Sequence, residues 1–208
     1  MRIRNGYVAE DGWELVSFDY NQIEMRVMAH VSQDEALLET YRKGGDVHTD
    51  TAMRAFGIKR VEDVDPEKHR RPSKTTGFGI IYQITPVGLS RQLIAMGAGS
   101  HWTEEECARF MDVWFGVHPG VKKYIDATRS EVRRKEEVRD MWGRRLLVPE
   151  VRAYSRQVQE AGLRKAGNMP IQGGAQGIIK EAMRQIGPRL ASDPSVRFIL
   201  QWETYPPV

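Results

Sequence analysis

The chain has 208 residues, of which 28% are charged and 40% hydrophobic, a composition typical of a soluble globular protein that can bury a core. Its 31 Lys and Arg against 28 Asp and Glu give a net charge of +3, which by itself favours neither nucleic acid nor a membrane as partner. The single cysteine, Cys107, excludes an intramolecular disulfide framework and a cysteine-rich zinc site. The sequence has no bilayer-length apolar run and no signal-peptide core, so we expect a cytoplasmic location and no membrane partner.

The first part of the chain predicts a β-hairpin that leads into a helix. The turn signal Asp11-Gly12 lies between apolar residues 7–9 and 15–18, which predicts two paired strands. Apolar residues then recur every four positions from Ile23 to Val31, the spacing of one helix face. A helix is therefore predicted to begin soon after Asp19.

Cap residues and periodicity predict the central part as a run of helices. Ser32-Gln33-Asp34-Glu35 has the form of a capping box, with Ser32 as the N-cap of a short helix that Gly44-Gly45 can end. Further helices are predicted over residues 48–56, 70–82, from 86, 104–116 and 119–135. The charged residues 59–68 include Pro66 and predict a loop.

The last third predicts a second hairpin and more helices. Strands over 138–142 and 145–148 would turn at Gly143-Arg144. Helical patterns cover 156–166 and 176–186 on either side of a Gly-Asn-Met-Pro stretch, and 196–201 predicts a closing strand. The balance of elements predicts a helix-rich α+β fold.

Positive charge is concentrated in one segment. Residues 121–165 contain 13 Lys and Arg against 7 Asp and Glu, so a phosphate backbone would lie here if the protein binds nucleic acid. The alternative, a solvated basic face with no ligand, stays open on charge alone.

Asp19 lies between a predicted strand and a predicted helix, where a carboxylate is held rigidly and exposed to a ligand. Taken alone, such an aspartate is more often a helix N-cap. Glu24 and Arg26 follow on the new helix without being needed for packing, and residues 19–26 together therefore indicate a site.

A second set of side chains forms one stripe on the helix predicted at 70–82. Spaced four residues apart, they are Arg70, Lys74, Phe78 and Tyr82. Cations bind phosphates and rings pack on sugar and base, so the stripe matches the parts of a nucleotide in order. The alternative is an amphipathic helix with its rings in the core and its cations in solvent.

These segments resemble the family-A DNA polymerases. Five of them match family motifs in the family's order and near its spacing: DYNQIEMR (19–26), DVHT (46–49), RRPSKTTGFGIIY (70–82), GRR (143–145) and NMPIQG (168–173). The resemblance covers roughly residues 1–201. It implies that residues 1–56 belong to a palm with an antiparallel sheet and that residues 57–135 form helical fingers. Residues 136–208 would then contain the hairpin, further helices and a closing palm strand.

The resemblance implies template-directed DNA synthesis by a DNA-directed DNA polymerase, a nucleotidyltransferase. Its partners would be primer-template DNA and deoxynucleoside triphosphates, and its cofactor two Mg²⁺ ions. Asp19 and the carbonyl of Tyr20 would ligate the metal ions, and oxygen ligands suit Mg²⁺. Asp19, Arg70 and Lys74 are the implied catalytic residues.

The resemblance also assigns the nucleotide and DNA contacts. At the nucleotide it implies Tyr20, Gln22, Glu24, His48, Arg70, Lys74, Phe78 and Tyr82, with Glu24 excluding a 2′-hydroxyl and Tyr82 at the templating position. On DNA it implies Arg71, Arg144 and Arg145 at phosphates, and Arg164, Asn168 and Gln172 on the minor-groove side.

The sequence departs from the family at its end and in the fingers helix. The family's second catalytic aspartate follows a strand that corresponds to 198–201, but the positions of its His-Asp-Glu segment hold Glu203, Thr204 and Tyr205. Gln83 stands where the family usually has Gly, and Gly77 stands where a side chain is common.

Three hypotheses follow from these departures. The chain is a palm-and-fingers fragment of a polymerase cut before the second aspartate, an inactive remnant that binds DNA and nucleotide, or one subunit of a split polymerase whose partner polypeptide carries the missing motif. Replacement of the missing aspartate by Glu203 also stays open.

Overall fold

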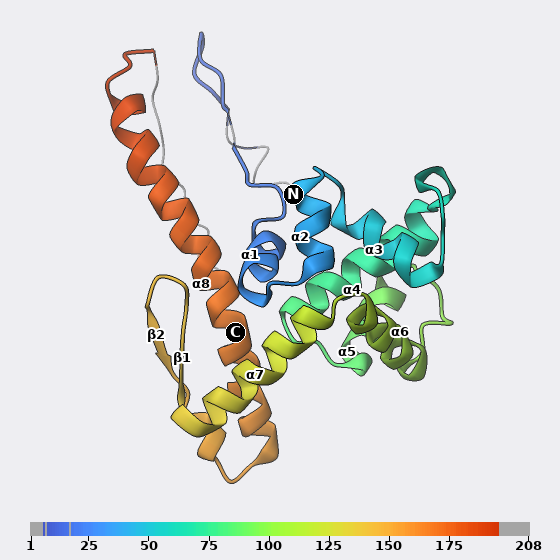
Figure 1. The fold of residues 1–208 in the computed structure, drawn as a ribbon. Coiled ribbons are helices and arrows are strands. Elements are labelled where there is room, and N and C mark those ends of the chain that lie inside the picture. Colours follow the sequence, from blue (N-terminus) through green and yellow to red (C-terminus); the bar gives the residue numbers. More distant parts are fainter. Residues whose placement is uncertain (1–5, 7, 17, 196–208) are drawn as a thin grey trace.

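A computed structural model describes residues 6, 8–16 and 18–195 as a helix-rich structure with one small sheet (Figure 1). The helices are α1 (Ile23–Ser32), α2 (Glu35–Arg42), α3 (Val47–Phe56), α4 (Arg71–Ile81), α5 (Pro86–Ala95), α6 (Glu104–Val117), α7 (Pro119–Lys135) and α8 (Arg156–Ala191). The strands are β1 (Glu137–Arg139) and β2 (Arg145–Leu147). These elements confirm the predicted helix-rich α+β class. The two-stranded sheet is the largest sheet among the described residues.

The predicted loop at 59–68 contains two short helical turns, Val61–Asp63 and Pro66–Arg70, and the second leads directly into α4. A third turn, Pro149–Arg152, connects the hairpin to α8. No helix within the described ranges is long and apolar enough to cross a membrane.

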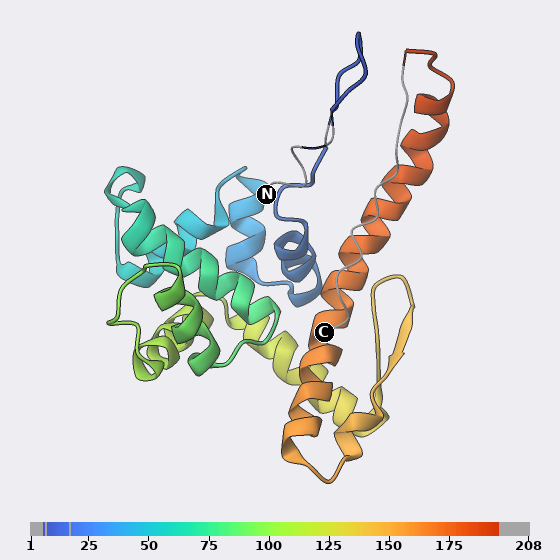
Figure 2. The same ribbon diagram turned by 180° about the vertical axis from the view of Figure 1, so that it is seen from behind.

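The main core forms around α1. One face of α1 buries Met25 and Met28 completely or almost so, and these side chains belong to one cluster with Ile81 of α4, Trp114 of α6 and Ile171 of α8. Figures 1 and 2 show α8 running as one long rod beside α1, with α3, α4, α5 and α6 gathered on the other side. This packing places the start of α1, the exposed face of α4 and the middle of α8 near one another.

Two smaller clusters support the periphery. The first joins α5 to α6 through Leu89, Leu93 and Phe110, with the free thiol of Cys107 buried among them. The second fixes the end of α7 and the hairpin to α8, and Val132, Val148 and Leu163 form its centre. The predicted hairpin is confirmed, since β1 and β2 pair antiparallel.

The predicted N-terminal strands are not found. The turn at Gly12 is present, with a φ of 82°, but residues 8–16 and 18–20 form no strand. Leu15 is 63% exposed and Phe18 is 91% exposed. A two-stranded hairpin is marginal unless one face packs on other elements, and among the described residues no surface covers these apolar side chains.

The predicted capping box is also wrong in detail. Ser32 is the last residue of α1, and the N-cap of α2 is Asp34, whose Oδ1 accepts a hydrogen bond from the Leu37 amide at 3.1 Å. Gln33 takes a left-handed φ of 51° that ends α1. Only Asp34 then has the extended backbone that an N-cap requires.

Residues 156–191 form one helix, although the sequence predicts a break at 167–170. Pro170 lies inside α8 and cannot donate a backbone hydrogen bond. Gly167, Asn168 and Ile171 around it are all buried, so packing against α1, α4 and the hairpin maintains the helix. The closing strand predicted at 196–201 lies outside the described residues.

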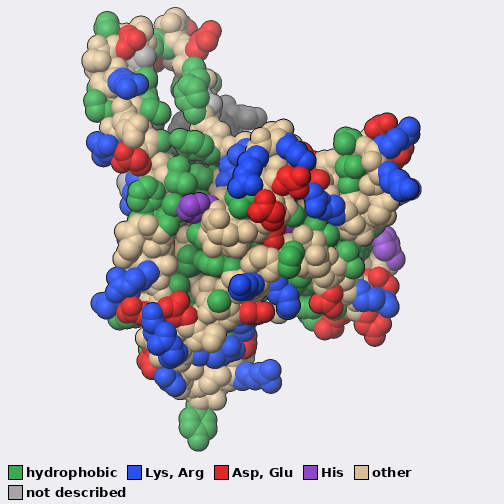
Figure 3. Space-filling model, viewed as in Figure 1, with side chains coloured by type: hydrophobic (Ala, Val, Ile, Leu, Met, Phe, Trp, Pro, Cys, Tyr) green, Lys and Arg blue, Asp and Glu red, His purple; other side chains and the backbone are tan. Residues whose placement is uncertain are grey.

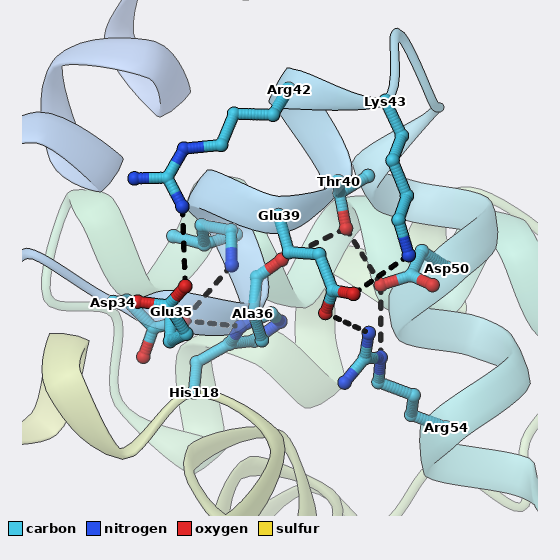
Figure 4. A network of polar contacts seen from close by, with 11 residues as sticks. Asp34, Glu35, Ala36, Glu39, Thr40, Arg42, Lys43, Asp50, Arg54 and His118 are labelled. Atoms are coloured by element: carbon cyan, nitrogen blue, oxygen red, sulfur yellow. Dashed lines mark hydrogen bonds and ion pairs between the residues drawn. The ribbon is translucent and has the colours of Figure 1, made fainter.

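A buried polar cluster joins α2, α3 and α7, and Figure 4 shows its residues Asp34 and His118 within a wider network of polar contacts around α2. Asp34 and His118 are each 1% exposed, and His118 Nδ1 lies 3.2 Å from Asp34 Oδ1. Its Nε2 lies 2.9 Å from the hydroxyl of Thr51, and the other Asp34 oxygen accepts from the Gly120 amide at 2.8 Å. Burial alone raises the pKa of Asp34, but the hydrogen bonds from His118 and these amides outweigh it and lower that pKa.

Candidate active site

The stripe predicted on the helix at 70–82 forms the accessible side of α4. Lys74 is exposed, and Arg70, Phe78 and Tyr82 are partly buried, whereas the opposite side of α4 is buried. Gly77 permits that packing, because a Cβ at this position would lie 3.3 Å from Met25 Cε and 3.5 Å from Trp114 Nε1. Close contact with α1 and α6 therefore explains a glycine within this helix.

Asp46 holds Arg70 at the start of α4. Asp46 is the N-cap of α3, and its Oδ2 accepts from the Thr49 hydroxyl at 2.6 Å and from Arg70 Nε at 2.8 Å. Partial burial raises the pKa of Asp46, but the hydrogen bonds from Arg70 and Thr49 outweigh it and hold the pKa well below its usual range. A permanent ion pair therefore fixes the Arg70 side chain beside α3.

His48 lies directly beneath the stripe. It is 2% exposed, and its ring centroid lies 5.4 Å from that of Phe78. Burial is the main cause that lowers the pKa of His48 to about 4; nearby Asp46 raises it, whereas Arg70 and Lys74 lower it. Its Nε2 is buried and has no hydrogen-bond partner among the described residues.

Glu24 and Tyr82 close the far end of the stripe. The Tyr82 hydroxyl donates to Glu24 Oε2 at 2.5 Å, and Glu24 is 7% exposed. Gln22, at the start of α1, donates to Asp46 Oδ1 at 3.3 Å and accepts from the Tyr41 hydroxyl at 3.0 Å. Residues from α1, α3 and α4 are thus linked into one polar site. The sequence did not single out Tyr41, and the role of Asp46 could have been inferred only from its N-cap spacing to Thr49.

Asp19 and Tyr20 lie in the extended segment before α1, and both are exposed. A carboxylate next to a free backbone carbonyl offers oxygen ligands of the kind that Mg²⁺ prefers. Within the described ranges, however, no three His, Cys, Asp or Glu side chains are grouped so that they could hold a metal ion. Asp19 is an exposed carboxylate, and the described residues hold no preformed group of three such side chains around it.

The three residues predicted on the minor-groove side share one face of α8. Arg164, Asn168 and Gln172 are spaced four apart on a continuous helix. Asn168 is 3% exposed, and its Oδ1 has no partner among the described residues. A buried polar atom without a partner is costly in a native protein, so this oxygen has an unused capacity to accept a hydrogen bond.

The three predicted phosphate-binding arginines differ in their surroundings. Arg71 pairs with Glu67 at 2.5 Å and donates to the carbonyl of Met96 at 3.2 Å. Arg145 is exposed on β2, with Glu137 3.4 Å away. The Arg144 side chain is instead turned toward α8.

Arg144 forms an internal clasp between the hairpin and α8. Its Nε donates to the buried carboxylate of Asp140 at 2.7 Å, one Nη donates to Gln176 Oε1 at 2.9 Å, and the other donates to the Gly173 carbonyl. Beside it the Trp142 indole donates to the Gly174 carbonyl at 3.1 Å. No local pattern predicts the contacts of this clasp with α8, because they join residues 29 to 32 positions apart.

Basic side chains of the 121–165 segment lie at the lower end of the molecule in Figure 3, around the end of α7 and the start of α8, with acidic side chains among them. Several are paired, including Arg129 with Glu160 and Arg152 with Glu136. This pairing places carboxylates beside several of the cations and leaves the segment's excess of positive charge unchanged.

His48 makes stability depend on pH. Its pKa in the folded chain is about 4, below its ordinary value, so between about pH 6.5 and pH 4 the unfolded chain binds a proton that the folded chain does not. The free energy of unfolding should fall by about 2–3 kcal/mol through this window as pH decreases. Urea titrations at pH 7, 5.5 and 4 should show that His48→Gln loses less stability over the same range; identical losses would contradict the buried neutral imidazole.

Comparison with known proteins supports the family resemblance. The model of DNA polymerase family A matches residues 1–202. The chain is 42% identical over 200 residues to the thermostable DNA polymerase I of Thermus aquaticus and 39% identical over 193 residues to DNA polymerase I of Streptococcus pneumoniae. These alignments cover 96% and 91% of this chain, but only 23% and 21% of the two relatives.

A solved structure with a similar fold is the POL domain of Pol1 from M. smegmatis in complex with DNA primer-template and dNTP. The TM-score is 0.74 at 37% sequence identity. The match covers 83% of this chain and 29% of that chain. The chain thus spans about a quarter of the length of the proteins that it matches.

Proposed function

Because the chain belongs to DNA polymerase family A, we propose that it is the palm-and-fingers portion of an enzyme that extends a DNA primer along a template. The observation that carries this proposal is the exposed stripe of α4, which faces the His48 and Glu24 side chains across one polar site. In the proposed arrangement residues 1–56 belong to the palm, 57–135 to the fingers, and 136–208 to the hairpin, the long helix and the rest of the palm.

The proposed site for the triphosphate is formed by His48, Arg70 and Lys74. Asp46 orients Arg70 through its Nε, which leaves the forked end of the guanidinium directed to phosphate oxygens. Lys74 is exposed one helical turn further on and adds a second positive charge. In this proposal, which follows the family resemblance, Lys74 also gives a proton to the departing pyrophosphate.

The sugar and base of the nucleotide are proposed to lie beyond Lys74. Phe78 would pack on the sugar, and its position is fixed by the His48 ring. Glu24 would occupy the space that a 2′-hydroxyl requires, and its hydrogen bond from Tyr82 holds it there. We therefore propose deoxynucleotides as substrates, with Tyr82 at the templating position.

Asp19 and the Tyr20 carbonyl are the proposed ligands of Mg²⁺, which in this enzyme class supplies charge neutralisation at the reacting phosphate. Asp19 is exposed at the start of α1, close in sequence to Gln22 and Glu24 of the nucleotide site. A two-metal site also needs a second carboxylate, and the candidates that the sequence leaves open are Glu203 and a residue of another polypeptide.

DNA is proposed to lie along α8 and the hairpin. Arg164, Asn168 and Gln172 would face the minor groove of the new base pair, where hydrogen-bond acceptors occupy similar positions in every pair. Arg71 and Arg145 would contact phosphates. Because most basic side chains here are paired internally, we expect weak and salt-sensitive binding.

Two neighbouring arginines of the hairpin should separate structural from electrostatic roles. Arg145→Ala should lower the slope of log affinity against log salt for a primer-template by about one, because one phosphate contact is lost. Arg144→Ala should leave the slope unchanged but reduce the free energy of unfolding by about 2–3 kcal/mol, because the Asp140 carboxylate, buried with its side chain 0% exposed, loses its charged partner. Salt titrations and urea unfolding of both variants measure this, and an equal slope change in both would contradict the clasp.

Primer extension tests the proposed function. The chain is incubated with primer-template, Mg²⁺ and four deoxynucleotides, alone and with separately expressed palm and thumb segments of a relative. Extension that the Asp19→Ala variant lacks supports the proposal. No extension by the unchanged chain under either condition contradicts catalytic competence.

A second candidate function is binding without catalysis. It is favoured by the sequence after Gln201, which has Glu203 one position away from the family's aspartate, since a shift by one residue on a strand points a side chain to the opposite face. Primer-template and nucleotide binding that is indifferent to Mg²⁺, together with no extension, would support this candidate.

A further inference from the structure

The junction that follows α4 has a non-glycine residue in the left-handed region, as the end of α1 does at Gln33. Gln83 has a φ of 52°, in the left-handed region that favours glycine, and its amide closes the helix by donating to the Ile80 carbonyl at 2.9 Å. Side chains are disfavoured in this backbone conformation, so contacts of the Gln83 side chain must compensate for it.

Those contacts connect three helices. Gln83 Oε1 accepts a hydrogen bond from Arg129 Nη1 on α7 at 2.8 Å, and Arg129 in turn pairs with Glu160 near the start of α8. Arg129 is 22% exposed at its side chain, so this is not a fully solvated surface pair. The same three residues line a cleft of about 290 Å³ that Arg164 of α8 also lines.

Gly167 of α8 leaves free the space that the Gln83 side chain occupies. A Cβ at position 167 would lie 1.4 Å from Gln83 Nε2 and 2.7 Å from its Cδ. The carboxamide therefore occupies the space that any side chain at 167 would need, one residue before Asn168. The glutamine and the glycine are complementary in shape.

We infer that Gln83 is a positioning residue, which fixes the end of α4 against α7 and α8. Gln83 thereby sets the distance between two groups of residues before any ligand binds. One group is the nucleotide-facing side chains of α4, and the other is the DNA-facing residues Arg164 and Asn168 of α8. This role rests on the proposed function, because it concerns the relation between the nucleotide and DNA parts of that site. A merely local contact would affect stability without affecting nucleotide affinity.

A double-mutant cycle tests the contact itself. Gly→Ala in a helix is stabilising where space permits, and Gly116→Ala in α6, with nothing within 4 Å of the added carbon, should raise the melting temperature by roughly 2–4 °C. Gly167→Ala should raise the melting temperature by the same amount when it is added to the Gln83→Gly variant. In the otherwise unchanged chain the new methyl displaces the carboxamide from Arg129, and the rise should be lost. An equal rise in both backgrounds would overturn the inference.

Nucleotide affinity tests the positioning role. The chain is bound to a primer-template with a dideoxy-terminated primer and titrated with the complementary deoxynucleotide in Mg²⁺. Gln83→Gly and Gly167→Ala should each weaken nucleotide binding at least about threefold. The double variant should bind nucleotide no more weakly than Gln83→Gly alone. Gly116→Ala should leave nucleotide binding unchanged. Binding of the primer-template without nucleotide should change less than twofold, because α8 itself is intact.

The outcomes separate this inference from the proposed function. If the unchanged chain binds nucleotide and all variants bind equally well, Gln83 has no positioning role. If the unchanged chain binds no nucleotide, both the proposed function and the positioning role are overturned, whatever the melting temperatures show.

Discussion

Replacement of Lys74 by alanine should weaken deoxynucleotide binding about 10- to 100-fold, since one charge-assisted contact to the triphosphate is lost. Lys74 is exposed on α4 and forms no ion pair with the residues that the structure describes, so the free energy of unfolding should change by less than about 0.5 kcal/mol. Calorimetric titration of nucleotide into the chain bound to a terminated primer-template measures the first effect, and urea unfolding measures the second.

Lys123→Ala is the matched control for Lys74→Ala. Lys123 is also an exposed helical lysine, but it lies on α7, away from the stripe. The two variants remove the same net charge, so a general electrostatic effect would weaken binding equally in both. Equal affinities of the Lys74 variant and the unchanged chain would show that the α4 stripe does not bind the triphosphate.

Replacement of Asp34 by alanine should reduce the free energy of unfolding by about 3–5 kcal/mol. The carboxylate is 1% exposed and serves as the N-cap of α2, as the partner of His118 and as the acceptor for the Gly120 amide. Its removal leaves the buried His118 and Gly120 groups without their acceptor. Because His118 also contacts Thr51 of α3, the loss would loosen the support of the helix that carries His48.

Two variants test the cause of this loss. Asp34→Asn keeps an oxygen that can cap α2 and should lose less stability than alanine. Asp126→Ala removes an exposed aspartate, with its side chain 65% exposed, and should change stability by less than about 0.5 kcal/mol. Urea unfolding at pH 7 compares them. A loss below about 1 kcal/mol for Asp34→Ala would contradict a structural role of the buried cluster.

Local signals predicted those parts of the fold where sequence neighbours decide the structure. Thr103 caps α6 as expected, with its hydroxyl accepting from the Glu106 amide, and Pro119 begins α7. The helix break predicted around Pro170 is wrong because tertiary packing of α8 on α1 and the hairpin overrides a local helix breaker. The prediction of N-terminal strands is wrong because tertiary packing is missing there: no described surface covers their apolar side chains.

The candidate site was predictable where its residues share one element. The spacing from Arg70 to Tyr82 on α4 and from Arg164 to Gln172 on α8 is a property of the helix itself. The pairs across elements, such as Asp46 with Arg70 and Glu24 with Tyr82, depend on packing that no local pattern encodes. For the same reason the contacts of Arg144 with Gly173 and Gln176 of α8 could not be anticipated.

The central claim is that the α4 stripe and the α8 face together select a nucleotide according to a DNA template. The most direct measurement is the affinity of each of the four deoxynucleotides for the chain bound to a dideoxy-terminated primer-template, repeated with each of the four templating bases. Template-directed selection requires that the tightest deoxynucleotide change with the templating base, always to its complement, and that the matching ribonucleotide bind more weakly. Affinities that do not depend on the templating base would contradict the account.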